Sequence, residues 1–320
     1  MQQVTPGSRR GIPIFFASLA LLAVARILLQ SFVDVPAGLL TVANFSMSAL
    51  FLGGPLLALC FAARDPWTPK TAALFVVLGV VVQVGCFLVN AKFINHASVM
   101  FQVINAIGQI GLPIWCVGLG ALLATLCKDK NILVPIAIFL AFLDMFLVFS
   151  PFGVTNRVIT RYPGILNAVA VQIPSAVRST TPGHAVHHVR AGSLAGPADF
   201  LFLAMFLIAL FRFQMKGKQT VMIVIPTLIA YMVLVTITHF SLPARVPIGL
   251  VVLVVNWREF KLTKDEKMST ALVGALGLGL FIWGMFQKPT VEPAEPSPTP
   301  AVQGAQAPPA TPGPVDPGQS

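Results

Sequence analysis

The chain of 320 residues is too apolar to be a water-soluble protein. Hydrophobic residues make up 56% of it and charged residues only 10%, whereas a soluble surface needs roughly a quarter or more of its residues charged. The net charge is +10, but the basic residues stand in small groups between apolar runs, a distribution that excludes a nucleic-acid-binding face. The composition predicts an all-α, polytopic membrane protein embedded in the lipid bilayer.

Nine apolar segments are candidates for membrane helices, each with about the 20 residues that a crossing takes or, in one case, fewer. They are 12–33, 37–63, 71–91, 99–127, 131–152, 194–214, 220–239, the short 244–257, and 269–286. Lys and Arg collect in short cytoplasmic loops of membrane proteins, and here they occupy every second connection, beginning with Arg9 and Arg10. We therefore expect a cytoplasmic N-terminus, with the long 153–193 connection and the C-terminal tail outside.

Cysteine and histidine give no sign of a metal site. The four cysteines lie in or beside apolar segments without CxxC spacing, and we expect them to be small buried hydrophobes: Cys60, Cys86, Cys116 and Cys127. The 153–193 connection carries three clustered histidines, His184, His187 and His188, but no acidic or Cys partner for them in a metal site. It also contains an extended stretch at 168–173 that we expect to end at Pro174. No metal or other cofactor is predicted.

Two of the eleven acidic residues lie inside apolar segments. Asp144 is close to the middle of the fifth segment, and Asp199 follows Gly196-Pro197-Ala198 near the outer end of the sixth. A carboxylate near the bilayer centre costs on the order of 3 kcal/mol and is a functional candidate by default. Because consecutive helices are antiparallel, they can turn Asp144 and Asp199 toward each other.

Two carboxyl groups at close range cannot both be ionised, so they share one proton and can activate water against a peptide bond. Such a pair needs no Ser or Cys nucleophile and no metal. Two other interpretations stay open. Asp199, near a Gly-Pro helix start, is also suited to cap that helix, and the pair equally suits the proton relay of a proton-coupled transporter.

A third feature is the segment 242–247, which opens an apolar run too short for a regular crossing. Pro243 and Pro247 have no amide hydrogen, so nearby carbonyl groups must line a wet cavity or pair with another backbone. An extended peptide substrate would supply that pairing. A kinked hairpin between two helices is the simpler interpretation.

Together these features resemble a known family of membrane proteases. Leu143-Asp144, Gly196-Pro197-Ala198-Asp199 and Pro243-Ala244-Arg245 stand in the order of the YD, GxGD and PAL motifs of the presenilin and signal peptide peptidase family. The stretches 144–149 and 206–213, which follow the two acids, also look like signal peptide peptidase. The resemblance covers roughly residues 130–257.

The resemblance implies a presenilin-like bundle of about nine helices in a divergent, prokaryotic-looking member. It implies an aspartic endopeptidase of a prokaryotic plasma membrane, oriented like signal peptide peptidase, that cuts transmembrane proteins or signal peptides within the membrane. It makes Asp144 and Asp199 catalytic and assigns substrate contacts to Gly196, Pro197, Ala198, Pro243, Ala244 and Arg245. The expected regions are four spans in 1–130, the catalytic region 131–257, a loop and last span in 258–287, and a disordered tail in 288–320.

All three motifs depart from the family pattern. Leu143 removes a tyrosine hydroxyl next to the first acid, Ala198 adds a methyl group before the second, and Arg245 places a cation where the family has leucine. A guanidinium that reached the two carboxylates would favour two negative charges and impair acid–base chemistry, whereas one that extended to the membrane surface would have little effect. A catalytically inactive member that binds membrane helices is therefore the alternative to a protease.

Overall fold

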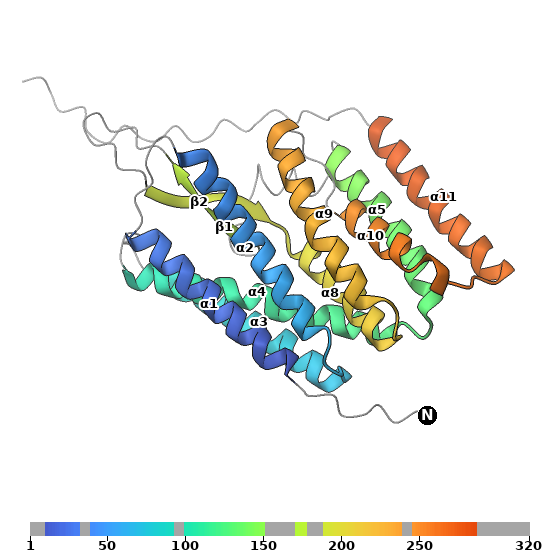
Figure 1. Ribbon diagram of the computed structural model, residues 1–320, viewed down its shortest axis with the longest axis horizontal. Helices are drawn as coiled ribbons and strands as arrows, with labels where there is room; N and C mark the ends of the chain where they lie inside the picture. Colours follow the sequence, from blue (N-terminus) through green and yellow to red (C-terminus); the bar gives the residue numbers. More distant parts are fainter. Residues whose placement is uncertain are drawn as a thin grey trace, which may run out of the picture. The chain divides into compact units, whose positions relative to one another are not determined.

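The chain folds mostly into helices (Figure 1). A computed structural model describes residues 10–32, 39–92, 99–150, 170–177, 188–238 and 245–286. The main helices are α1 (Gly11–Phe32), α2 (Leu40–Ala62), α3 (Pro69–Asn90), α4 (Val99–Leu126), α5 (Leu133–Phe149), α8 (Pro197–Arg212), α9 (Gly217–Thr238), α10 (Arg245–Val255) and α11 (Lys264–Phe286). Two short 3-10 turns, η2 (Lys130–Ile132) and η3 (Trp257–Glu259), precede α5 and follow α10.

Six helices in the described part of the chain are long and apolar enough to cross a membrane. They are α1 to α5 and α11, and they coincide with the first five and the last of the predicted segments. The prediction of a predominantly helical, polytopic membrane protein is thus confirmed. By contrast, α8 and α10 have only 16 and 11 residues, fewer than a regular crossing requires.

A two-stranded hairpin is the only β-structure in the described part of this mostly helical fold. Strand β1 (Val171–Val177) pairs antiparallel with β2 (His188–Ala195) and packs on α2. The strand does not end at Pro174 as expected, because the register shifts between Ile173 and Pro174 and the irregularity accommodates a residue without an amide hydrogen. The segment predicted as a helix from 194 therefore begins as a strand.

Helix α4 is the most buried of the six candidate spans, and it packs against α3 and α8. It approaches its neighbours closely at its glycines. A Cβ atom added to Gly111 would lie 2.6 Å from the carbonyl oxygen of Gly79 on α3, and one added to Gly120 would lie 2.8 Å from that of Leu201 on α8. Such contact between helix backbones is possible only where side chains are absent. The position of α8 is therefore fixed by its packing on α4.

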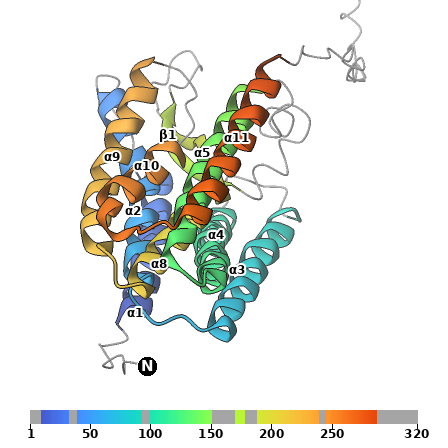
Figure 2. The ribbon, with the colours of Figure 1, turned by 90° about the vertical axis from the view of Figure 1, so that its right-hand side faces the viewer.

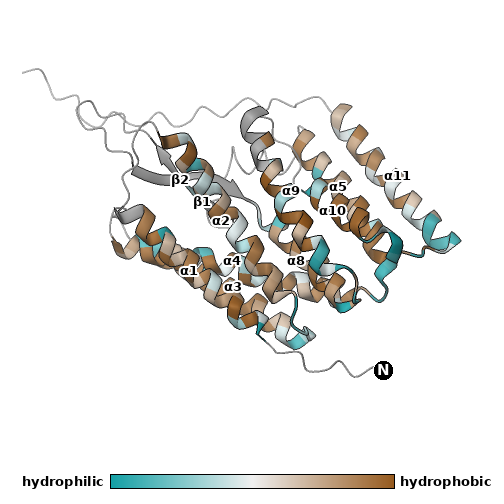
Figure 3. Ribbon diagram, viewed as in Figure 1, coloured by the Kyte–Doolittle hydropathy of each residue, from teal (hydrophilic) through white to brown (hydrophobic). Residues whose placement is uncertain are grey.

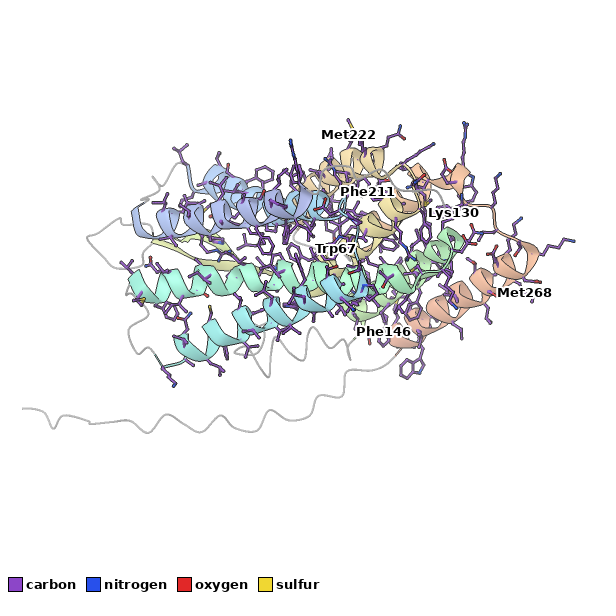
Figure 4. All side chains as sticks on the ribbon, turned by 90° about the horizontal axis from the view of Figure 1, so that it is seen from below. Trp67, Lys130, Phe146, Phe211, Met222 and Met268 are labelled. Atoms are coloured by element: carbon purple, nitrogen blue, oxygen red, sulfur yellow. The ribbon has the colours of Figure 1, made fainter. Side chains whose placement is uncertain are left out.

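Helix α5 belongs to a second packing group, with α10 and α11 (Figure 2). Gly277 of α11 lies against Phe142 of α5, where an added Cβ would be 2.8 Å from the Phe142 side chain. Phe146 lies between α5 and α11 (Figure 4), with its ring centroid 6.4 Å from that of Trp283. Asp144 and Asp199 are thus carried by helices that take their main packing from different neighbours.

Polar contacts gather at one end of the helices. We call it the basic end, because seven Lys and Arg residues of the connections lie there: Arg64, Lys70, Lys128, Lys130, Lys216, Lys218 and Arg258. Hydrophilic residues mark it in Figure 3 at the α8–α9 turn and at the start of α11. The side chain of Asn131, before α5, donates to the carbonyl oxygen of Lys261 at 3.1 Å. The side-chain carbonyl of Asn256 accepts the main-chain N–H of Lys216 at 3.1 Å. The first bond joins the segments before α5 and α11, and the second joins the start of α9 to the end of α10.

Asp65 caps the N-terminus of α1 at the same end. Its carboxylate accepts the main-chain N–H groups of Gly11 at 3.3 Å and Ile12 at 2.7 Å. The first amide groups of a helix have no partner within it, and an acidic group there also meets the positive end of the helix dipole. Asp65 therefore joins the start of α1 to the connection between α2 and α3.

We expect Asp65→Ala to destabilise the protein by about 1–2 kcal/mol, the range for loss of a helix cap. Thermal unfolding of the purified protein in detergent measures the change. The control is Asp265→Ala, because Asp265 is an exposed acid in the first turn of α11. Equal midpoints for the two variants would contradict a stabilising role of Asp65.

Candidate functional site

Three residues that the sequence singled out meet inside the helical bundle. The Nη1 atom of Arg245 lies 3.4 Å from Oδ1 of Asp144, and its Nε atom lies 3.3 Å from Oδ1 of Asp199. The side chains of Arg245 and Asp144 are 13% and 8% exposed, and that of Asp199 is 29% exposed. The guanidinium of Arg245 thus bridges the two acids of the predicted pair.

The bridge limits the distance between the two carboxylates. The Nε and Nη1 atoms of one planar guanidinium are about 2.3 Å apart, so the two Oδ1 atoms lie within about 9 Å of each other. A water molecule that bonds both carboxylates needs a separation of about 6 Å or less. The guanidinium contacts both carboxylates, so a water that bonded both of them would have to replace it.

Helix N-termini place both carboxylates. Arg245 is the first residue of α10, and its main-chain N–H donates to Oδ2 of Asp144 at 2.9 Å. Asp199 lies in the first turn of α8, after Gly196 at the N-cap and Pro197. The positive end of a helix dipole favours an acidic group in each position. Asp199 additionally contacts Arg245, so its role is not confined to the start of its own helix.

The helix registers bring these groups to one level. At 1.5 Å per residue, Asp144 stands about 16 Å above the first residue of α5, and Asp199 about 20 Å above the last residue of α8. Arg245 stands about 15 Å above the last residue of α10. All three of these helix ends lie at the basic end, so the three groups stand about 15–20 Å from that end along their helices, comparable to half of a hydrocarbon core about 30 Å thick.

Two aromatic residues that the sequence did not single out belong to the site. The guanidinium carbon of Arg245 lies 5.5 Å from the centre of the Phe202 ring, within the range of a cation–π contact. Tyr231 of α9 lies close enough to Asp144 and Asp199 for both carboxylates to act on it electrostatically. In the sequence, Tyr231 could have been noticed as a phenol within an apolar helix. Whether it faces Asp144 and Asp199 depends on the rotation of α9, which the sequence of α9 alone does not show.

The other predicted site residues are placed in part. Pro243 and Ala244 lie outside the described residues, as do His184 and His187. Gly196 and Pro197 begin α8, followed directly by Ala198. A Cβ atom added to Gly196 would have nothing within 4 Å, so packing does not require glycine there. Leu143 packs against the hydrophobic core.

An apolar cleft lies below Asp199, between α2, α8 and α9. Leu203 and Leu207 line it from α8, and Leu228 and Ile229 line it from α9. Leu203 is one helical turn from Asp199, and Leu228 is one turn from Tyr231. The cleft therefore extends from between these helices to within a turn of the site.

The arrangement offers no evident metal centre. In residues 10–32, 39–92, 99–150, 170–177, 188–238 and 245–286, no group of three or more His, Cys, Asp or Glu side chains is suitably placed for a metal ion. All four cysteines are free thiols. The chemistry available at the site is that of two carboxylates, one guanidinium and a nearby phenol.

Comparisons with protein-family models, with curated proteins and with solved structures found no match for this chain.

We expect Arg245→Met to destabilise the protein by about 3 kcal/mol, since it leaves two carboxylates without their shared cation in apolar surroundings. The melting temperature in detergent should fall by several degrees. Arg258→Met is the matched control, because Arg258 is exposed at the basic end. Adding Asp144→Asn and Asp199→Asn to Arg245→Met should restore most of the lost stability. An unchanged melting temperature in Arg245→Met alone would rule out a stabilising bridge.

Proposed function

We propose that the protein is an intramembrane aspartyl protease, with Asp144 and Asp199 as its catalytic pair. The single observation that carries the proposal is the meeting of Asp144, Asp199 and Arg245, which come from three separate stretches of sequence. Each stretch resembles one motif of the presenilin and signal peptide peptidase family. A common site is what the resemblance to that family requires.

In the proposed reaction, the ionised carboxylate takes a proton from a water molecule as the water oxygen attacks the peptide carbonyl carbon. The protonated carboxyl group donates its proton to the carbonyl oxygen. The tetrahedral intermediate then collapses, its C–N bond breaks, and the nitrogen receives a proton from the pair. This chemistry requires one proton shared by Asp144 and Asp199, and no metal.

Arg245 reaches both carboxylates and so favours the doubly ionised pair, but the charges at the site also balance when the pair holds one proton. With one proton on Asp144 and Asp199, the pair has one negative charge and the guanidinium neutralises it. A site with no net charge is the least costly to place in apolar surroundings. The described arrangement is then a resting state, and the side chain of Arg245 leaves the space between the acids when substrate and water enter.

The proposed substrates are transmembrane proteins or signal peptides in the bilayer. The apolar cleft between α2, α8 and α9 supports access from the lipid, because its lining approaches within one turn of Asp199. The alternating basic connections support a cytoplasmic basic end, which gives the orientation of signal peptide peptidase. We further propose that the protein lies in a prokaryotic plasma membrane and crosses it about nine times.

A second candidate function is supported by the bridge itself. If Arg245 remains between the two carboxylates, water has no place there, and the protein binds membrane helices without cutting them. The two candidates differ in one property, which is whether the guanidinium of Arg245 exchanges its partners when a helix is bound.

The first test is co-expression with single-span reporter proteins oriented with their N-termini at the basic end. We expect cleavage by the wild type and at least a 100-fold loss in Asp144→Asn and in Asp199→Asn, since each removes a proton-transfer group. Immunoblotting and mass spectrometry of the fragments measure it. Asp265→Asn is the control. Cleavage that persists in both variants would exclude the pair, and binding without cleavage would favour the second candidate.

Tyr231 gives a finer test. We expect Tyr231→Phe to lower the cleavage rate roughly tenfold with little change in KM, because both carboxylates act electrostatically on the phenol and removal of a polar group that acts on reacting groups costs about 1–2 kcal/mol. Initial rates in proteoliposomes over a range of substrate densities separate the two constants. Thr227→Val on the same helix, whose hydroxyl bonds the carbonyl of Ile223, is the control. A rate equal to that of the wild type would remove Tyr231 from the site.

A further inference from the structure

Arg245 creates a requirement that the substrate has to meet. Its guanidinium is 13% exposed and contacts Asp144, Asp199 and the ring of Phe202. A buried cation without an anionic partner is strongly unfavourable. Any step that frees the two carboxylates for catalysis must therefore give the guanidinium another anion.

The two contacts of Arg245 differ in how easily they can be exchanged. Asp144 is also held by the main-chain N–H of Arg245, a hydrogen bond that does not depend on the side chain. The Nε group faces Asp199 at 3.3 Å without a well-aligned hydrogen bond. The guanidinium can thus leave while the start of α10 stays bound to Asp144, so that α10 need not move.

The described part of the chain provides no second anion within reach. Its remaining acids all lie at the basic end: Asp65, Asp129, Glu259, Asp265 and Glu266. That end is about 15 Å from Arg245 along α10. An arginine side chain extends about 7 Å from its Cα atom, so neither these acids nor lipid phosphates at the surface of a core about 30 Å thick can replace the pair.

We propose that Arg245 selects transmembrane substrates that carry an aspartate or glutamate close to the bond that is cut. The inference rests on the proposed protease function. The substrate carboxylate takes the guanidinium from Asp144 and Asp199, and this exchange both neutralises the substrate's own buried charge and opens the space for water. A reach of about 7 Å corresponds to about two residues of extended chain on either side of that bond.

The test uses full-length protein in proteoliposomes and a set of single-span reporters that differ at one position. Leucine at each position within three residues of the cut, mapped by mass spectrometry, is replaced by Glu or by the uncharged Gln. At one position at least, we expect the Glu reporter to be cut at least tenfold faster than the Gln reporter at low substrate density. The ratio should fall to about one in Arg245→Leu and remain unchanged in Arg258→Leu.

Two further measurements test the proposal: reversal of the charge at position 245, and binding of the reporters without cleavage. Arg245→Glu should prefer a Lys reporter over a Glu reporter, which a merely structural role of Arg245 would not produce. Photo-crosslinking of the same reporters measures binding independently of cleavage. Equal cutting and equal crosslinking of the Glu and Gln reporters would overturn the acidic specificity while leaving the protease function intact. An Arg245-dependent preference for Glu in crosslinking, without any cleavage, would support the recognition and overturn the protease function.

Discussion

One guanidinium between two carboxylates in apolar surroundings is the interaction on which this structure depends. Asp144 and Asp199 belong to helices with different packing partners, because α8 lies on α4 whereas α5 packs with α10 and α11. Neither acid is tolerable alone at this depth, and neither is the cation. Arg245 meets both requirements at once and thereby joins the two packing groups through charge as well as through apolar contact.

The rest of the bundle keeps this interaction in place from one side. Hydrogen bonds that Asp65 and Asn256 accept and that Asn131 donates connect the helices at the basic end. Close glycine contacts of α4 position α8, which carries Asp199, and those of α11 support α5 on both sides of Asp144. The short helix α10 brings its N-terminus, rather than its side, to the acids. Its first amide group can therefore hold Asp144 while the Arg245 side chain exchanges partners.

The same geometry gives a role to Arg245, which replaces the leucine of the family's third motif. A leucine at position 245 would leave two carboxylates to share one proton with a net negative charge between them. Arg245 neutralises that charge and fills the space between the acids, which makes the resting site stable and closed. The chemical question at this site is thus the exchange of an ion pair, and substrates able to take part in that exchange are the ones that suit it.

The sequence by itself determined where the helices run and which two carboxylates are exceptional. Both are local quantities, since the length of an apolar run and the cost of an acid within it need no knowledge of neighbours. The start of α8 was misplaced, because residues 194 and 195 are as apolar as a helix but pair with β1. Only the tertiary structure decided that Arg245 turns inward between Asp144 and Asp199 and that Tyr231 comes within electrostatic range of both acids. These outcomes depend on the rotation and depth of α9 and α10 against α5 and α8, which packing fixes and no single segment encodes.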